Sequence, residues 1–134
     1  MSSSSPDERR FHRDHLWVMP AADQPGEVYV GISDFAQKQL GKILFVELPR
    51  AGERIEGGAP FGTVESYKVV SELIAPLTGE VVDANPQLRQ AAGLVNEDCY
   101  GNGWLVRIRM SVPEELSPLL TADAYLSMLG SRAK

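Results

Sequence analysis

The sequence predicts a small, mainly β protein, built as an antiparallel sandwich or barrel with a few short helices. Short apolar segments rich in β-branched residues recur along the chain, and turns rich in glycine, proline, asparagine or aspartate separate them. No long amphipathic segments alternate with them, as the crossover helices of a parallel sheet would require. At 134 residues the chain suits a single domain with its own core.

The apolar segments give the expected strands. They cover residues 16–19, 28–32, 43–48, 61–65, 69–75, 80–84 and 105–110. Residues 51–62 show a short strand, a glycine turn and a second short strand, and residues 73–82 show a similar order with a Pro/Gly turn. Lys68 therefore lies between two segments with a similar order of strand, turn and strand.

Three short helices are expected between or after the strands. Ser33 is a good N-cap for the first helix, with Asp34 at its positive end and Gly41 as its stop. The dipeptide Asn85-Pro86 predicts a second helix, with Gly93 as its end. Pro113 followed by two glutamates starts a third by the same logic.

A further helix is expected at the end of the chain, between a cap at Thr121 and a stop at Gly130. Its apolar residues recur at a spacing of three or four, so the helix should pack as a lid on the sheets. The side chains expected to face inward are Tyr125, Leu126 and Leu129.

Charge and composition limit the function classes. Eighteen acidic and thirteen basic residues give a formal charge of −5, which argues against nucleic acid or an anionic membrane surface as the partner. No apolar run approaches the ~20 residues of a membrane-spanning helix. Residues 1–10 lack an apolar signal core and predict a disordered tail ahead of one domain, residues 11–134, in a cytoplasmic protein.

Lys68 is the most informative single residue. It stands in a strand-like run that polar residues interrupt at its middle, which predicts the tip of a tight β-hairpin. A lysine held there has its amine in water, at the end of a flexible four-carbon chain that is a natural site for acylation. A solvated turn lysine is the ordinary alternative.

The run around Lys68 resembles the lipoyl-attachment motif of the glycine cleavage system H protein family, which is written Glu-Ser-x-Lys followed by a small or apolar pair and Ser. Here it reads Glu65-Ser66-Tyr67-Lys68-Val69-Val70-Ser71. Further blocks resemble the family in the same order, and the resemblance covers residues 11–129. These blocks are His15-Leu16-Trp17, residues 30–37, Leu40-Gly41, residues 45–49, residues 76–81, Leu94-Val95-Asn96, Tyr100-Gly101 and Gly103-Trp104-Leu105.

The resemblance implies a lipoyl-domain-like barrel-sandwich hybrid that acts as a carrier and not as an enzyme. Lipoate would be joined to Lys68 as an amide, and Glu65 and Ser66 match the neighbours that a lipoate-attaching enzyme recognises. A swinging arm at high effective concentration would then visit partner enzymes in turn. The residues expected to line a cleft near the arm are His15, Leu16, Ser71 and Glu72.

Two departures from the family pattern bear on the cargo. Leu16 stands where the family usually has Glu, and Glu72 stands where it usually has Asp. A protonated amine in a partly dry cleft needs a carboxylate partner, which Leu16 cannot supply. We therefore lean toward the related lipoate-binding proteins of bacterial sulfur oxidation, which carry sulfur intermediates to heterodisulfide-reductase-like complexes. The alternative is aminomethyl transport between glycine decarboxylase and aminomethyltransferase, with dihydrolipoyl dehydrogenase as a third partner.

Three other functions are considered. A biotinyl carrier also uses a hairpin lysine, but that family flanks it with methionines, whereas Tyr67 and Val69 stand here. A transferase using His15 and a carboxylate is a second possibility, and an interaction module with an unmodified Lys68 is a third. Intact mass after expression with lipoate or biotin separates the lipoyl carrier from the biotinyl carrier. Turnover of small substrates by the Lys68→Arg protein would support the transferase, and native protein without an adduct would favour the interaction module.

The remaining reactive residues give no catalytic or metal site. His12 and His15 lie near Asp14, but two histidines without a second ligand cluster are too few for a zinc site. Cys99 is the only cysteine, so no intramolecular disulfide is possible. It lies where the family commonly has proline, and we interpret it as a small turn-filling residue. A thiol that exchanges with a bound dithiol is the alternative.

Overall fold

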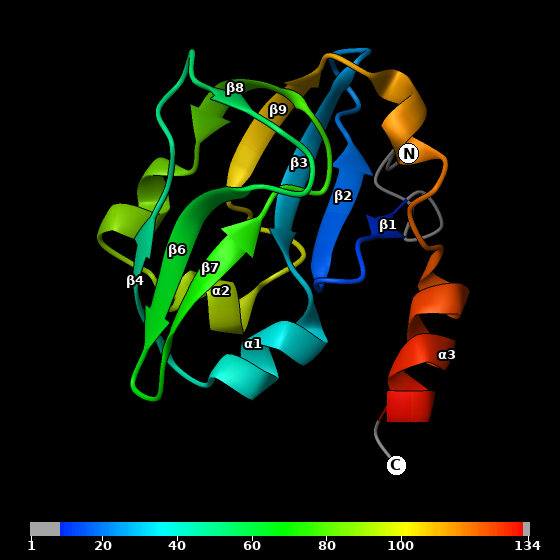
Figure 1. Ribbon diagram of the computed structural model, residues 1–134. Helices are drawn as coiled ribbons and strands as arrows, with labels where there is room; N and C mark the ends of the chain where they lie inside the picture. Colours follow the sequence, from blue (N-terminus) through cyan, green and yellow to red (C-terminus); the bar gives the residue numbers. More distant parts are fainter. Residues whose placement is uncertain (1–8, 133–134) are drawn as a thin grey trace.

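The computed structural model describes residues 9–132 and contains two antiparallel sheets (Figure 1). The larger sheet has six strands in the order β1-β2-β3-β9-β8-β5, and the smaller has three in the order β4-β6-β7. The strands are β1 (Arg10–Phe11), β2 (Leu16–Pro20), β3 (Glu27–Ile32), β4 (Ile43–Glu47), β5 (Arg54–Ile55), β6 (Pro60–Ser66), β7 (Val70–Ile74), β8 (Gly79–Ala84) and β9 (Val106–Met110). Every strand expected from the sequence is present, and β1 is an additional one.

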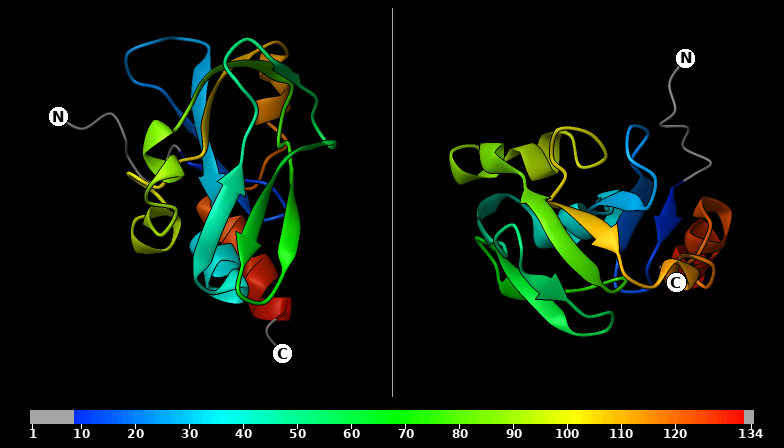
Figure 2. Two further views of the ribbon diagram at one scale, coloured as in Figure 1. Left: turned by 90° about the vertical axis from the view of Figure 1, so that its left-hand side faces the viewer. Right: turned by 90° about the horizontal axis from the view of Figure 1, so that it is seen from above.

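A single apolar core lies between the two sheets. Val18 and Ile108 face it from the larger sheet, and Val64 and Leu73 face it from the smaller one; all four are almost fully buried. The β-branched residues that predicted strands therefore form the inner faces of a sandwich. The views in Figure 2 show the three-stranded sheet as a layer of its own.

The first helix forms as predicted. α1 (Asp34–Leu40) begins after Ser33, whose Oγ accepts a hydrogen bond from the Ala36 amide at 3.2 Å. It ends at Gly41, which adopts φ 79°, a conformation that glycine reaches without steric cost. Both predicted caps are therefore confirmed.

The second helix is shorter than predicted. Asn85 caps the 3-10 helix η2 (Pro86–Arg89), which ends well before Gly93. Gly93 instead precedes α2 (Leu94–Glu97), so it begins a helix and does not stop one. The prediction was wrong because proline and glycine signals mark breaks in the chain without fixing which side of the break is helical.

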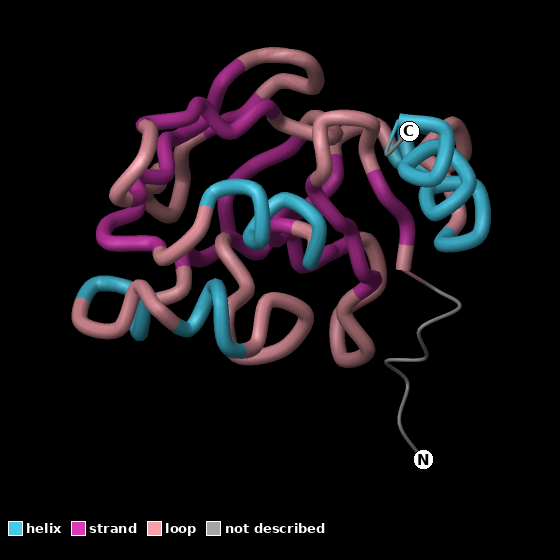
Figure 3. Tube along the Cα trace, turned by 90° about the horizontal axis from the view of Figure 1, so that it is seen from below, coloured by secondary structure: helices cyan, strands magenta, loops and turns pink. Residues whose placement is uncertain are grey.

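The helices after β9 agree in place with the sequence. η3 (Pro113–Leu116) is a 3-10 helix, and α3 (Ala122–Arg132) follows Thr121, whose Oγ1 accepts from the Ala124 amide at 3.2 Å. α3 runs past Gly130, so that glycine does not end it. Figure 3 shows α3 at one side of the molecule, apart from α1 and α2.

One inward-facing residue of α3 was assigned wrongly. Tyr125 is buried and Leu129 packs against the same cluster, as expected, but Leu126 is 62% exposed. α3 contacts β1 at the edge of the larger sheet, so only a narrow stripe of the helix meets the body. Leu126 lies just outside that stripe.

The first strand begins earlier than the expected boundary between residues 10 and 11. Residues 1–8 of the expected tail lie outside the described residues, whereas Arg10 belongs to β1 and pairs with Val18. Arg9 places its guanidinium 4.4 Å from the ring centroid of Tyr100. Among the described residues, no helix is long and apolar enough to cross a membrane.

Candidate functional site

Lys68 lies at the tip of the hairpin formed by β6 and β7, as the sequence predicted. The Ser66 amide donates to the Val69 carbonyl at 2.9 Å, so Tyr67 and Lys68 are the two residues of the turn. Both are exposed, Tyr67 to 75%. In Figure 1 this tip lies at the same end of the molecule as α1.

Ser66 holds the turn from inside. It is only 6% exposed, and its Oγ lies 3.2 Å from the Lys68 amide and 3.3 Å from the Val69 amide. Both backbone amides can therefore donate to one buried oxygen, which reduces the freedom of the turn. The lysine side chain projects from a rigid base.

The Lys68 side chain lies against the end of α1. A methyl group at Gly41 would be 3.5 Å from Lys68 Cε and 3.9 Å from Nζ. The Lys68 side chain therefore packs against the bare backbone of Gly41, the residue that follows Leu40 at the end of α1.

Asn96 fixes this surface and was missed by the sequence analysis. Its Nδ2 donates to the Gly41 carbonyl at 2.8 Å and to Gln37 Oε1 at 3.0 Å, while its Oδ1 accepts from the Ile43 amide at 2.8 Å. One side chain of α2 therefore joins the end of α1 to the start of β4. The sequence block Leu94-Val95-Asn96 marked the position, but nothing local indicated partners more than fifty residues away.

A small cleft of about 160 Å³ lies between α1, the start of β2 and the β6–β7 hairpin. All four cleft residues expected from the sequence line it together: His15, Leu16, Ser71 and Glu72. Its other lining residues are Asp14, Ile32, Phe35, Ala36, Gln39, Leu40, Val64 and Leu73. Leu40 lines the cleft and precedes Gly41, so the Lys68 side chain lies one residue away from the cleft lining.

His15 is held at the rim of the cleft by its neighbours. Its Nδ1 lies 2.8 Å from the Tyr125 hydroxyl, which lies 2.7 Å from Ser33 Oγ, and its ring lies 4.9 Å from that of Phe35. His15 has φ 73°, an uncommon backbone conformation for a residue with a side chain. Such strain clusters at functional sites, where the surrounding structure maintains it.

The cleft has an apolar floor and carboxylates on its lining. Leu16 is 3% exposed and belongs to the main core cluster. Asp14 and Glu72 line the same cleft and are both exposed to solvent. Leu16 therefore does not leave the cleft without an acidic group.

Glu65 lies away from the cleft. It pairs with Phe45 of β4 and Val70 of β7, and it is exposed on the outer face of the smaller sheet, opposite to the buried Val64. The structure thus places Glu65 outside the sandwich and Ser71, His15 and Leu16 along its inner edge. Glu72 lies opposite Thr63, in a row that faces outward like that of Glu65, and lines the cleft from the exposed edge strand β7.

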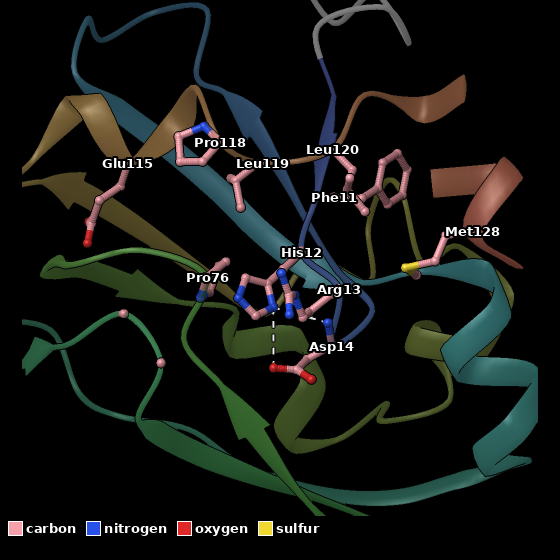
Figure 4. Close-up of a pocket in the computed structure, with 12 residues that line it drawn as sticks. Phe11, His12, Arg13, Asp14, Pro76, Glu115, Pro118, Leu119, Leu120 and Met128 are labelled. Carbon is pink, nitrogen blue, oxygen red and sulfur yellow. Dashed lines mark hydrogen bonds and ion pairs between the residues drawn. The ribbon is translucent and has the colours of Figure 1, made fainter. Parts of the chain in front are cut away.

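A larger cavity of about 680 Å³ contains none of the predicted site residues (Figure 4). His12 faces it, and His12 Nδ1 accepts from the Asp14 amide at 3.1 Å and lies 3.4 Å from Asp14 Oδ2. Burial lowers the pKa of His12. Among residues 9–132, no three histidine, cysteine or acidic side chains are grouped as metal ligands.

Cys99 is buried away from the hairpin. Burial raises the pKa of its thiol to about 11, and its carbonyl accepts a hydrogen bond from Trp17 Nε1 at 2.9 Å. A protonated, buried thiol is a poor nucleophile, so this environment favours packing over thiol exchange. Trp17 is a core residue, and Trp104 packs edge-on against Tyr29.

Comparison with known proteins identifies the family. The sequence model described as Glycine cleavage H-protein matches residues 9–132, almost the whole chain. The chain belongs to the glycine cleavage H-protein family. A glycine cleavage system H protein from Magnetococcus marinus is 44% identical over 126 residues, which are 94% of this chain and 88% of the relative. A probable glycine cleavage system H protein from Natronomonas pharaonis is 49% identical over 125 residues, 93% of this chain and 96% of the relative.

A solved structure of the H-protein family has the same fold. The crystal structure of a glycine cleavage system H protein from Mycobacterium marinum matches with a TM-score of 0.83 at 38% identity, and the match covers 93% of this chain and 98% of that chain. The predicted fold class is therefore confirmed, with two sheets, a few short helices and a C-terminal helix.

Proposed function

We propose that this H-protein family member is a lipoyl carrier, a component of a multienzyme system that is not itself an enzyme. The observation that carries the proposal is Lys68, exposed at the tip of a hairpin whose turn is held by the buried Ser66. One domain presents the lysine, and the arm attached to it visits partner enzymes without releasing its cargo to water.

The residues around Lys68 fit a lipoyl amide. The side chain lies over Gly41, where no side chain obstructs a longer arm, and next to it is a cleft lined mostly by apolar side chains. When bound, lipoate supplies a dithiolane at the end of this arm. His15, Leu16 and Phe35 would shield the arm's apolar end from water.

For the cargo, the glycine-derived aminomethyl group fits better than a sulfur intermediate. Relatives that share 44–49% of their residues with this chain carry the name glycine cleavage system H protein. The preference for sulfur chemistry depended on the apolar Leu16. Asp14 and Glu72 line the same cleft and would pair with a protonated amine there.

Glycine decarboxylase, aminomethyltransferase and dihydrolipoyl dehydrogenase are the partners that this function implies, along with a lipoate-attaching enzyme. Glu65 and Ser66 would have different roles toward that enzyme. Glu65 is exposed and available for contact, whereas Ser66 is buried and shapes the turn. Ser66 is thus a residue that positions Lys68.

The test is glycine decarboxylation with purified components. Lipoylated protein, mixed with glycine decarboxylase and labelled glycine, should release labelled CO2 and retain the label from the methylene carbon. Lys68→Arg keeps the positive charge and should support neither. Release that is no faster with the lipoylated protein than with Lys68→Arg would contradict the proposed cargo, and a parallel reaction with a heterodisulfide-reductase-like complex would then test sulfur transfer.

A further inference from the structure

The C-terminal helix α3 reaches the carrier cleft through one polar group, the hydroxyl of Tyr125. That oxygen lies 2.8 Å from His15 Nδ1 and 2.7 Å from Ser33 Oγ. His15 stands directly before β2, and Ser33 caps α1. Residues at the start of β2 and residues of α1 line the cleft. One hydroxyl, more than ninety residues along the chain from both partners, therefore joins two of the elements that form it.

The backbone of His15 is fixed on both sides. Its amide donates to the His12 carbonyl at 2.8 Å, and its carbonyl accepts from the Ser33 amide at 2.9 Å. These bonds maintain φ 73°, a conformation that residues with a side chain adopt rarely. The backbone therefore determines where the imidazole begins, and contacts of the ring determine where it points.

A hydrogen bond and an aromatic contact hold the imidazole ring. Its Nδ1 faces the Tyr125 hydroxyl, and its centroid lies 4.9 Å from that of Phe35, with the planes tilted by 42°. Phe35 lines the cleft. A contact between two rings tolerates many orientations, whereas a hydrogen bond requires its donor and acceptor to be aligned. The hydroxyl therefore selects one orientation of the His15 ring.

The ring of Tyr125 has a different role from its hydroxyl. It is buried and stacks on Phe11 of β1, with centroids 4.4 Å apart and planes within 6°. This packing holds α3 at the edge of the larger sheet without the oxygen. Ser33 Oγ also accepts from the Ala36 amide, so the cap of α1 remains when the hydroxyl is removed. Loss of the hydroxyl alone therefore acts on His15.

We propose that Tyr125 is a positioning residue for the carrier cleft, whose hydroxyl holds the His15 ring over the rim so that the ring covers the end of the arm. This inference rests on the proposed function, because it requires an arm on Lys68 that enters the cleft. The cleft measures only about 160 Å³. Turning one imidazole ring at its rim therefore changes how much water reaches the arm.

The first measurement is made on the unmodified full-length protein and needs no arm. In the wild type, NMR should show nuclear Overhauser effects between the rings of His15 and Phe35, which lie 4.9 Å apart. Tyr125→Phe keeps the stacked ring and should lose these effects. Tyr29→Phe is the matched control, because it also removes one hydroxyl, which accepts from Arg107 at 2.9 Å on β3. Tyr29 does not line the cleft, so this variant should keep them.

The second measurement is the loss of the labelled aminomethyl cargo from protein that glycine decarboxylase has loaded. Hydrolysis consumes one water. The carbon–sulfur bond breaks with its electron pair going to sulfur, which gains a proton, the carbon–nitrogen bond then breaks, and formaldehyde and ammonium leave. Tyr125→Phe should release labelled formaldehyde about threefold or more faster than wild type, a change within the range of one lost hydrogen bond. Tyr29→Phe should stay within about 1.5-fold of wild type.

A double variant tests whether the hydroxyl acts through His15. Asparagine tolerates a positive φ and lacks the imidazole ring, so His15→Asn should release the cargo as fast as Tyr125→Phe does. Adding Tyr125→Phe to His15→Asn should then change the rate by less than about 1.5-fold. Effects of the two substitutions that multiply independently would show that the hydroxyl acts by another route, and would overturn the inference.

Three further outcomes would also overturn it. Unchanged effects between the His15 and Phe35 rings in Tyr125→Phe would show that the hydroxyl does not orient His15. Loss of those effects with an unchanged release rate would make the contact purely structural, and the carrier function would stand. A wild-type protein that takes no lipoyl group would overturn the proposed function together with the role of Tyr125.

Discussion

At the scale of single residues, the surface under Lys68 depends on a glycine. Gly41 adopts φ 79° and ψ −159°, and its missing side chain leaves room for the Lys68 methylenes. A Cβ at this position would meet Lys68 only at ordinary contact distance, so the backbone conformation and not crowding sets the cost of a substitution.

Gly41→Ala should therefore destabilise the protein by ~1–3 kcal/mol, because the alanine would be held in a conformation that L-residues avoid. Chemical denaturation measures this change. Gly130→Ala is the matched control, since Gly130 lies within α3 with open space around it and should gain up to ~1 kcal/mol from higher helix propensity. Equal stability changes for the two variants would contradict the conclusion that the backbone conformation of Gly41 requires glycine.

Cys99 gives a pH-dependent prediction. Burial raises its pKa from 9.0 to about 11 in the folded protein, so folding favours the neutral thiol. The stability it contributes is complete below pH 9.0 and is lost as the pH rises toward 11, by about 2–3 kcal/mol in total. The stability difference between wild type and Cys99→Ser should shift by that amount across this window in denaturation curves. A difference that stays constant from pH 8 to pH 11 would contradict burial of the thiol.

At the scale of elements, α2 acts as a brace for the end of α1. Asn96 makes three hydrogen bonds. One is to Gly41, the residue that the Lys68 side chain lies against, and the other two are to Gln37 before it and Ile43 after it in the chain. A four-residue helix is too short to be stable alone, so its value lies in the side chain that it presents.

Asn96→Ala should cost about 2–4 kcal/mol, because it removes these bonds and leaves the Ile43 amide and the Gly41 carbonyl without their partner. Hydrogen exchange should show the Ile43 amide losing protection first. Asn102→Ala, at an exposed position in the loop after α2, should change stability by less than about 0.5 kcal/mol. Unchanged exchange at Ile43 in Asn96→Ala would refute the role of the brace.

At the scale of the whole molecule, the sequence predicted correctly those features that depend on residues close together in the chain. The hairpin around Lys68 and the caps of α1 follow from turn and capping residues within a few positions, and both are present. The inward face of α3 was partly wrong because helical spacing does not tell how wide a stripe the body covers, which left Leu126 in solvent. Asn96 was missed because its partners come from distant parts of the chain.

Phe45 and Val70 show the converse limit, because their surroundings depend on strands that are distant in the sequence. The sequence places Phe45 and Val70 in apolar segments, where both would be expected to face a core. Only the pairing of β4, β6 and β7 puts them together on an outer face beside Lys68. Family membership, in contrast, was readable from the sequence, because its motifs extend over most of the chain.

The most direct test of the carrier account is peptide mapping by mass spectrometry of the protein purified from its own cells with lipoate available. The account predicts one lipoyl amide, on Lys68 and not on the nearby Lys38 or Lys42, and none on the Lys68→Arg protein. An unmodified Lys68 in protein from such cells, or the lipoyl group on another lysine, would contradict it.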